Sequence, residues 1–387
     1  MIYIKVYLDN AATTYPKPDC VYNGMMNYMK NIGASSSRGA YCNALESSRL
    51  VYNCRKELSL FFNFPKIENV IFTPNVTTSL NILLKSVIKD GWHIITSSME
   101  HNSVLRPLNS IEKHKNIEID IIQCNSNGLI PINEFKSKIK HNTKLVILSH
   151  ASNIIGTIQP LEKIGEICKN KDIYFIIDSA QTAGNIPLDF NKLKFSALAF
   201  TGHKSLIGPQ GIGGFLITDE LNNEAIPFIE GGTGSESENP FQPSFLPDKF
   251  ESGTLNTPGI AGLYEGLKFI KNTGINYIKE RETYLFKYFL HHLLNLDFIK
   301  VYGHNPNLLY TPTMSINLKD MDSSMLSFIL DRDFGIATRS GLHCAPLAHK
   351  TIGSFPSGTV RFSIGFFNTM DDINYTINSL IKIYKRK

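Results

Sequence analysis

The sequence lacks the features that mark several common classes of protein. None of its six cysteines belongs to a Cys-x-x-Cys pair, which argues against a disulfide framework and favours a reducing cytoplasm. No apolar run approaches the roughly 20 residues that a membrane helix needs, so we expect no membrane partner. Residues 1–8 lack the charged-then-apolar layout of a signal peptide.

Charge and nucleotide motifs are also sparse. The net charge of +5 is small for 387 residues, and the basic tail at 385–387 is typical of a solvated chain end, so no nucleic-acid partner is expected. There is no Gly-x4-Gly-Lys-Ser/Thr motif, and no Gly-x-Gly-x-x-Gly follows the first strand. These absences exclude a P-loop and argue against a dinucleotide site.

What the chain does contain is an alternation of short β-rich runs and amphipathic segments, which predicts an α/β fold with helices on both faces of the sheet. The expected strands are 70–73, 93–97, 117–123, 144–150, 174–178 and 197–201, and the expected helices are 78–88 and 161–168. An irregular segment follows at 231–257. A helix at 260–270, strands at 313–318 and 359–364 and a helix at 370–383 then predict a smaller α+β domain.

Polar clusters follow five of these strands, at Thr73, 98–101, 152–153, 178–181 and 201–204. Ligands of α/β sheets collect at the carboxyl ends of strands, so the clusters predict a shared site. The loop at 73–79 joins a strand to a helix start, where free N–H groups form an anion site. Ordinary capping by Thr77 or Thr78 is the alternative, and it does not exclude phosphate.

Two charged residues at strand ends have a chemical and a structural interpretation. Lys204, among glycines and a histidine, is either a desolvated Schiff-base amine or a turn lysine facing water. Asp178 ends an apolar run and needs a partner, which is a protonated pyridine nitrogen, a nearby lysine or a helix cap. His101 could stack on a flat ring, and Gln181 could share the ligand. A ring, its acidic partner, a phosphate and a lysine together indicate pyridoxal phosphate.

The run Arg339-Ser-Gly-Leu-His-Cys-Ala-Pro-Leu-Ala-His349 places one cysteine between a cation and two imidazoles. We expect Arg339 and His343 to lower the pKa of the Cys344 thiol, because positive charge favours the thiolate. A remote alternative is a non-catalytic metal-binding protein that uses His343, Cys344 and His349. Their spacing does not match a structural zinc pattern, and no metal site is expected.

With these motifs in order, the chain resembles the class V aminotransferase family of fold-type I pyridoxal-phosphate enzymes, and within it the cysteine desulfurase branch. The resemblance covers nearly the whole chain and rests on segments 7–14, 99–102, 152–157, 178–181, 201–204, 250–257, 339–344 and 360–363. It implies a fold-type I transferase with a large domain, residues 15–257, built on a mostly parallel seven-stranded sheet. Residues 1–14 and 258–387 would form a small α+β domain that carries the catalytic cysteine segment.

The resemblance also implies roles for individual residues. The catalytic residues would be Lys204, which carries the cofactor, Cys344 and His101. The cofactor would be held by Thr77, His101, Asp178, Gln181, Thr201, His203 and Lys204, and by Thr254, which would reach the phosphate of a partner subunit in a homodimer. The substrate would be oriented by Asn153, Arg339 and Arg361, with the Arg361 guanidinium clamping its carboxylate.

The implied activity is that of a cysteine desulfurase, which converts L-cysteine to L-alanine and leaves a persulfide on Cys344 for a protein sulfur acceptor. The chain departs from the family pattern at Asn75, where glycine is frequent, and Asn tolerates a left-handed backbone. The short loop from Cys344 to Arg361 favours the group with a compact cysteine segment. The alternatives within the family are a selenocysteine lyase, another lyase or an aminotransferase.

Overall fold

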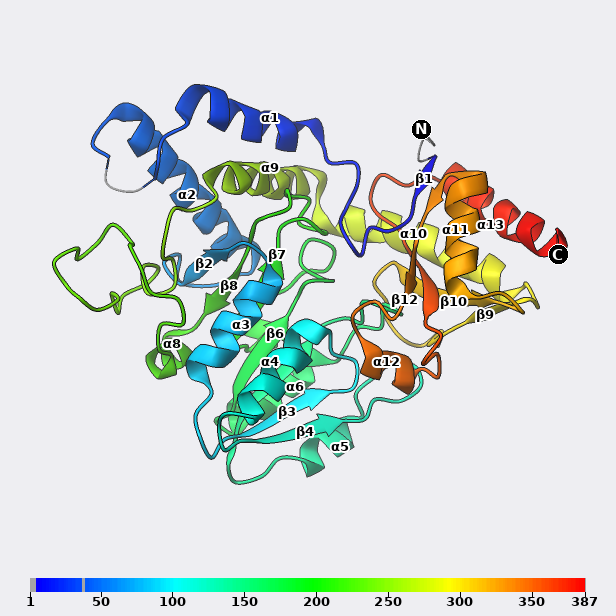
Figure 1. Cartoon of the computed structure of the whole chain (residues 1–387), viewed down its shortest axis with the longest axis horizontal. Helices are drawn as coiled ribbons and strands as arrows, with labels where there is room; N and C mark the ends of the chain where they lie inside the picture. The colour runs from blue at the N-terminus through cyan, green and yellow to red at the C-terminus, as the bar shows by residue number, and fades with distance from the viewer. Residues whose placement is uncertain (1–4, 37–38, 387) are drawn as a thin grey trace.

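The computed structural model describes residues 5–36 and 39–386. A seven-stranded sheet forms the centre of the larger part, and a smaller four-stranded sheet lies beside it (Figure 1). The strand order of the large sheet is β2–β8–β7–β6–β5–β3–β4. Its strands are β2 Val70–Thr73, β3 His93–Ser97, β4 Glu118–Ile122, β5 Thr143–Ser149, β6 Tyr174–Asp178, β7 Ala197–Thr201 and β8 Gly213–Ile217.

Only β8 runs against its neighbours in this sheet, so the prediction of a mostly parallel seven-stranded sheet is confirmed. Because β2 and β7 are both antiparallel to β8, they run in the same direction as each other. The carboxyl ends of β2, β3, β5, β6 and β7 therefore lie at one edge. The five polar clusters that follow these strands meet there.

The central strands are apolar on both sides because helices cover both faces of the sheet. In β5, Leu145 and Ile147 belong to one hydrophobic cluster, while Val146 and Leu148 belong to the other, as the period of two requires. The first cluster includes helices α3 Val76–Val87 and α4 Asn102–Glu112. The second includes α2 Cys42–Phe61, α6 Leu161–Asn170 and α9 Thr257–Thr273.

The smaller part has an antiparallel sheet in the order β12–β13–β10–β9 and a hydrophobic core of its own. Its elements are α10 Ile275–Leu294, β9 Ile299–Val301, β10 Thr313–Leu318, α11 Ser323–Phe334, β12 Arg339–Gly341, α12 Pro346–Thr351, β13 Thr359–Ser363 and α13 Met370–Lys385. Near the start of the chain, β1 Val6–Tyr7 pairs with β11 Ile336–Ala337. The remaining elements are α1 Asp19–Asn27, η1 Tyr28–Ile32, α5 Ile132–Ser137, α7 Phe190–Leu193 and α8 Asp219–Glu224.

Most of the expected elements are present, and the expected strands at 93–97, 174–178, 197–201 and 313–318 match the structure to the residue. The alternative interpretation, in which Thr77 or Thr78 caps the helix after β2, is wrong. Asn75 caps α3 instead, with its side-chain oxygen accepting from the Thr78 N–H at 2.9 Å, so the helix begins at Val76. Asn75 also has an extended backbone, with φ −171°, so its left-handed tolerance is not used.

The division of the chain at residue 257 stays a prediction. Helix α9, which follows that point, packs against α1 and α2 and buries Ile260, Leu263 and Leu267 in the large core. Across residues 5–36 and 39–386, no helix has the length and apolar character needed to cross a membrane.

Candidate active site

A cleft at the carboxyl ends of the parallel strands brings together several of the predicted site residues. Its lining comes from the segments after β2, β3, β5, β6 and β7: Val76, His101, Ser103, Ser149, Ala151, Asn153, Asp178, Ala180, Gln181 and Lys204. Five of these, His101, Asn153, Asp178, Gln181 and Lys204, are predicted site residues. The sheet topology explains this convergence, because the five strands end at one edge.

Lys204 lies in the turn after β7, and Thr14 of the N-terminal segment donates hydrogen bonds to this turn. The Thr14 hydroxyl donates to the Lys204 carbonyl at 2.9 Å, and the Thr14 N–H donates to the His203 carbonyl at 3.1 Å. Burial lowers the pKa of Lys204 to about 8, although the charge of Asp178 opposes the shift. A larger share of this amine is therefore neutral near pH 7 than for an ordinary lysine, as a carbonyl-trapping amine requires.

Asp178 is a buried carboxyl at the end of β6. Burial raises its pKa, and the Ala180 N–H, which donates at 2.9 Å, and the charge of Lys204 oppose that rise. One charge-assisted contact with a cationic ligand group would complete its surroundings.

Sequence reasoning missed a second buried carboxyl, Glu100. It accepts from the Ser97 hydroxyl at 2.6 Å and from the hydroxyl and N–H of Ser149 at 2.7 and 2.8 Å. Burial raises its pKa to about 7 despite these donors, and the charge of Asp178 adds to the rise. The sequence indicated a role for Glu100 only through its position directly before His101.

His101 presents a neutral ring to the cleft. Its Nδ1 accepts from the Ser103 N–H at 3.0 Å, which caps α4 and leaves that nitrogen unprotonated. Burial lowers the His101 pKa to about 4, and the cations Lys204, Arg339, Arg361 and Arg106 lower it further. A neutral flat ring can stack on an aromatic ligand without repelling a cationic nitrogen.

Three predicted site residues each have a buried polar atom that no described residue satisfies: Thr201 Oγ1, His203 Nδ1 and Arg361 Nε. Buried polar atoms are nearly always paired. The pKa of His203 is lowered to about 4 by burial and by Lys204 and Lys17, so its ring is neutral. A hydroxyl, an imidazole and a guanidinium N–H suit a ligand with anionic oxygens, and they fit the phosphate and carboxylate groups of a cofactor–substrate pair.

Arg361 lies on β13 and is almost fully buried. Its Nη1 donates to the Asn153 carbonyl at 3.0 Å and its Nη2 donates to Asp9 Oδ1 at 2.6 Å. Arg339 is the exposed residue opposite it in the antiparallel ladder, and cross-strand neighbours share a face of the sheet. The two arginines predicted to bind substrate are thus placed together.

Cys344 has an exposed thiol on a firmly held backbone. The Cys344 carbonyl accepts from the Asn102 N–H at 2.8 Å, and the His343 carbonyl accepts from Asn153 Nδ2 at 2.8 Å. Asn102 follows His101, and Asn153 lines the cleft. Direct hydrogen bonds therefore join the cysteine segment to the cleft that holds Lys204.

The prediction that His343 is a cation acting on Cys344 is wrong. Burial, followed by the charge of Arg361, lowers the pKa of His343 to about 3, so the ring is neutral at physiological pH. Arg339 is the remaining candidate for that effect, and its influence on the thiol stays a prediction.

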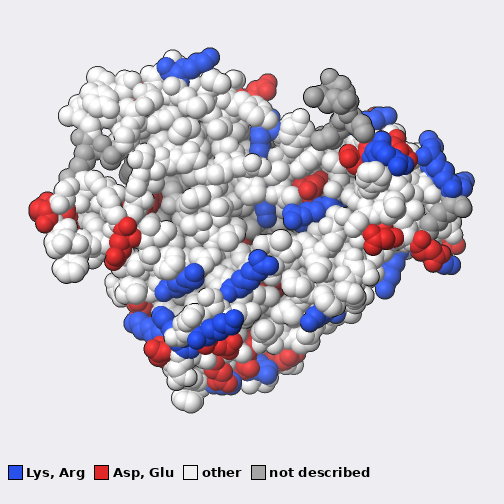
Figure 2. Space-filling model, in the orientation of Figure 1, with Lys and Arg blue, Asp and Glu red and all other residues white. Residues whose placement is uncertain are grey.

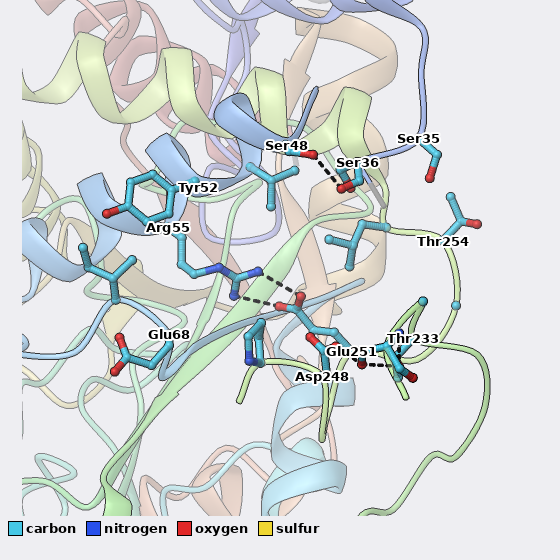
Figure 3. Close-up of a pocket in the computed structure, with 17 residues that line it drawn as sticks. Ser35, Ser36, Ser48, Tyr52, Arg55, Glu68, Thr233, Asp248, Glu251 and Thr254 are labelled. Atoms are coloured by element: carbon cyan, nitrogen blue, oxygen red, sulfur yellow. Dashed lines mark hydrogen bonds and ion pairs between the residues drawn. The ribbon is translucent and has the colours of Figure 1, made fainter. Parts of the chain in front are cut away.

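Four predicted cofactor residues are not part of the cleft lining: Thr77, Thr201, His203 and Thr254. Thr77 is exposed, and Val76 contributes to the cleft wall in its place. Thr254 lines a separate cavity of about 480 Å³. Figure 3 shows an Arg55–Glu251 ion pair there, between helix α2, which carries Ser48, and the segment that carries Thr254. In a single chain, Thr254 thus does not share a cavity with Lys204.

The described part of the chain contains no group of three His, Cys, Asp or Glu side chains arranged to hold a metal ion. His343 and His349, which the metal-binding alternative needs, are hydrogen-bonded to each other at 3.3 Å. The remaining ring nitrogens lie within hydrogen-bond distance of the Arg339 carbonyl and the Ser354 hydroxyl.

Comparison with known proteins gives consistent results. The family model described as aminotransferase class-V matches residues 6–376. A "Probable cysteine desulfurase" of Borreliella burgdorferi is 32% identical, with 98% of this chain and 92% of the relative covered. A cysteine desulfurase of Wigglesworthia glossinidia brevipalpis is 30% identical, with coverage of 98% and 93%. The apo structure of a cysteine desulfurase from Thermococcus onnurineus superposes with a TM-score of 0.93 at 30% identity, covering 99% of this chain and 95% of that one.

Proposed function

The chain belongs to the aminotransferase class-V family, in its cysteine desulfurase branch, and we propose that it takes sulfur from L-cysteine with pyridoxal phosphate, releasing L-alanine and leaving a persulfide on Cys344. The observation that carries the proposal is the position of Cys344. Its thiol is exposed, yet Asn102 and Asn153 tie its backbone to the Lys204 cleft. A transaminase has no use for a thiol held in this way.

The residues of the cleft fit the cofactor. Lys204 would carry it, Asp178 would face its ring nitrogen, His101 would cover the ring and Gln181 would bind its ring oxygen. Thr77, Thr201 and His203 would hold its phosphate, and the orphaned atoms of Thr201 and His203 support this. When bound, pyridoxal phosphate supplies an electron sink for the substrate's α-carbon.

The chain's own residues then bind substrate and move protons. The guanidinium of Arg361 has a free Nε and would take the substrate carboxylate, with Arg339 beside it on the same face. Asn153 orients this group through its carbonyl. Lys204, with its pKa lowered to about 8, can take a proton from the α-carbon and return it, because both of its protonation states are accessible near neutral pH.

The sulfur step needs a nucleophilic thiol and no outside oxidant. The Cys344 thiolate attacks the substrate sulfur, so that an S–S bond forms as the substrate C–S bond breaks. The electron pair of the C–S bond goes to the substrate carbon, which is protonated to give the methyl group of alanine. One cysteine and one protein thiol thus become one alanine and one persulfide, which passes to a protein acceptor.

A homodimer would complete the site, with Thr254 reaching the phosphate bound in the partner subunit. In the view of Figure 2, the surface over α1 and α2 is largely free of charged side chains, while acidic side chains appear at the segment before α9. Exposed apolar residues on these elements include Tyr22, Met26, Tyr41, Tyr52 and Phe241. Aromatic and methionine side chains with little charge are typical of interface cores. All six cysteines are free, which suits a reducing cytoplasm.

The experiment measures alanine released from L-cysteine and from selenocysteine, with wild type and Cys344→Ala. We expect wild type to release alanine from both substrates and the variant to lose the cysteine reaction. A variant that retains wild-type release from cysteine would contradict the role of Cys344. Wild type that acts on selenocysteine alone would identify a lyase instead.

A further inference from the structure

We propose that His349 and Ser354 are positioning residues for the sulfur-accepting thiol, because they complete a buried hydrogen-bond chain that fixes His343 as a neutral ring behind Cys344. The inference rests on the proposed function of Cys344. It adds residues that touch neither the Lys204 cleft nor the thiol. The sequence pattern gave His349 a part only in the metal-binding alternative, and it gave Ser354 none.

The distances determine which nitrogen of each ring carries a proton. His343 Nε2 lies 3.1 Å from the Arg339 carbonyl, which can only accept, so Nε2 is protonated. The Nδ1 of the neutral His343 ring must then accept, and its neighbour at 3.3 Å is His349 Nε2, which therefore donates. His349 Nδ1 accepts in turn from the Ser354 hydroxyl at 2.7 Å. Every polar atom of both rings is thus engaged.

The hydrogen-bond chain from His343 through His349 to Ser354 is shielded from water. His349 is fully buried and His343 nearly so. The cationic side chains that act on His343 are Arg361 on β13 and Arg339 on β12, and His349 on α12 faces it from the other side. Burial and these neighbours lower the pKa of His343 to about 3, and burial lowers that of His349 to about 4. With both rings neutral, every ring nitrogen in this hydrogen-bond chain has a donor or acceptor partner.

The position of the Cys344 thiol depends on this hydrogen-bond chain, because the chain helps to hold the backbone of residues 343 and 344. His343 and Cys344 both have left-handed backbones, with φ of 49° and 58°, which non-glycine residues adopt at a cost. Two carbonyl contacts, from Asn102 and Asn153, hold the segment on the cleft side. The His343 ring holds it on the other side, through His349. Removing His349 would free that ring to turn.

The test is alkylation of the resting protein, with no substrate present, followed by mass analysis of the peptides. Cys42 is the second exposed cysteine and serves as the internal reference in the same tube. The variants are His349→Leu, which removes the donor, and His349→Gln, which keeps an N–H donor. The ratio of iodoacetamide modification at Cys344 to that at Cys42 is followed from acid to alkaline pH.

The wild-type protein gives the reference ratio at each pH. His349→Leu should change the ratio across the whole pH range, since the His343 ring is then no longer held in place behind Cys344. The ratio should rise by about threefold, because a less firmly held segment exposes the Cys344 thiol to the reagent more often. His349→Gln should restore the wild-type profile. A His349→Leu profile that overlays wild type in a folded protein would overturn the proposal.

If His349→Leu does not fold, Ser354→Ala decides, because it deletes one hydroxyl and leaves the ring in place. It should shift the profile in the same direction by a smaller amount, and an unchanged profile would overturn the proposal. The alkylation needs no turnover. Its outcome is therefore separate from the outcome of the desulfurase assay, which tests the proposed function itself.

Discussion

Arg361 Nη2 lies 2.6 Å from Asp9 Oδ1, which joins strand β13 of the smaller part to the segment that follows β1. The guanidinium proposed to take the substrate carboxylate is therefore already held before substrate arrives. Its Nη1 is held by the Asn153 carbonyl, and its Nε points to no described partner. Asp9 thus holds the buried guanidinium in a fixed position and leaves its Nε nitrogen available to the ligand.

Replacing Asp9 with Ala should destabilise the fold. The change leaves a buried guanidinium without its counter-ion, and breaking such a pair costs about 3 kcal/mol. The free energy of unfolding in urea measures the effect. Asp219→Asn is the matched control, since its pair with Lys66 is exposed and should contribute little. Equal effects of the two substitutions would contradict the account of Asp9.

The rate at which the apoprotein binds pyridoxal phosphate covalently should rise with pH to a plateau, with an inflection near the lowered Lys204 pKa of about 8. Only the neutral amine attacks an aldehyde, so a lower pKa moves the inflection down from its usual value near 10.5. Since the Asp178 charge raises the Lys204 pKa, Asp178→Asn should move the inflection lower still. An upward shift in that variant would show that the charge of Asp178 does not act on Lys204.

Glu282 should make the protein less stable as pH rises. It is buried, its Oε2 accepts from Asn185 Nδ2, and burial raises its pKa to about 8 from 4.5. Between these two values the folded state holds a proton that the unfolded state releases, so stability is lost as pH rises through that window. Glu282→Gln should be more stable than wild type at pH 8, relative to pH 5, by at least about 1 kcal/mol. Urea titrations at the two pH values measure this, and a difference that does not depend on pH would refute it.

Mixing two inactive variants should restore activity if Thr254 serves the partner's site. Lys204→Ala removes the lysine, and Thr254→Trp blocks the contact. A hybrid dimer has one site built from the intact Lys204 of one chain and the intact Thr254 of the other. Random mixing should then recover about one quarter of wild-type activity. If Thr254 served its own chain, no hybrid would contain an intact site and the mixture would stay inactive.

Much of this arrangement was predictable because it depends on local pattern. The apolar runs that form β6 and β7 end at Asp178 and Thr201, and the parallel direction of the strands brings the following residues to one edge. The protonation state of His343 was not predictable from the sequence, since it depends on burial and on the contact with His349. The Asp9–Arg361 pair spans 352 positions, and no spacing rule connects residues so far apart. The N-cap of α3 could not be chosen from the sequence, because Asn75, Thr77 and Thr78 are all residue types that can cap a helix.

The most direct test of the central claim is the mass of the peptide that contains Cys344 after one addition of L-cysteine to the enzyme loaded with pyridoxal phosphate. The account predicts the mass of one additional sulfur atom on Cys344, removable by a thiol reductant, together with one alanine per site. The Lys204→Ala protein, treated in the same way, should show no added sulfur. Alanine released without any sulfur on Cys344, or sulfur found only on another cysteine, would contradict the account.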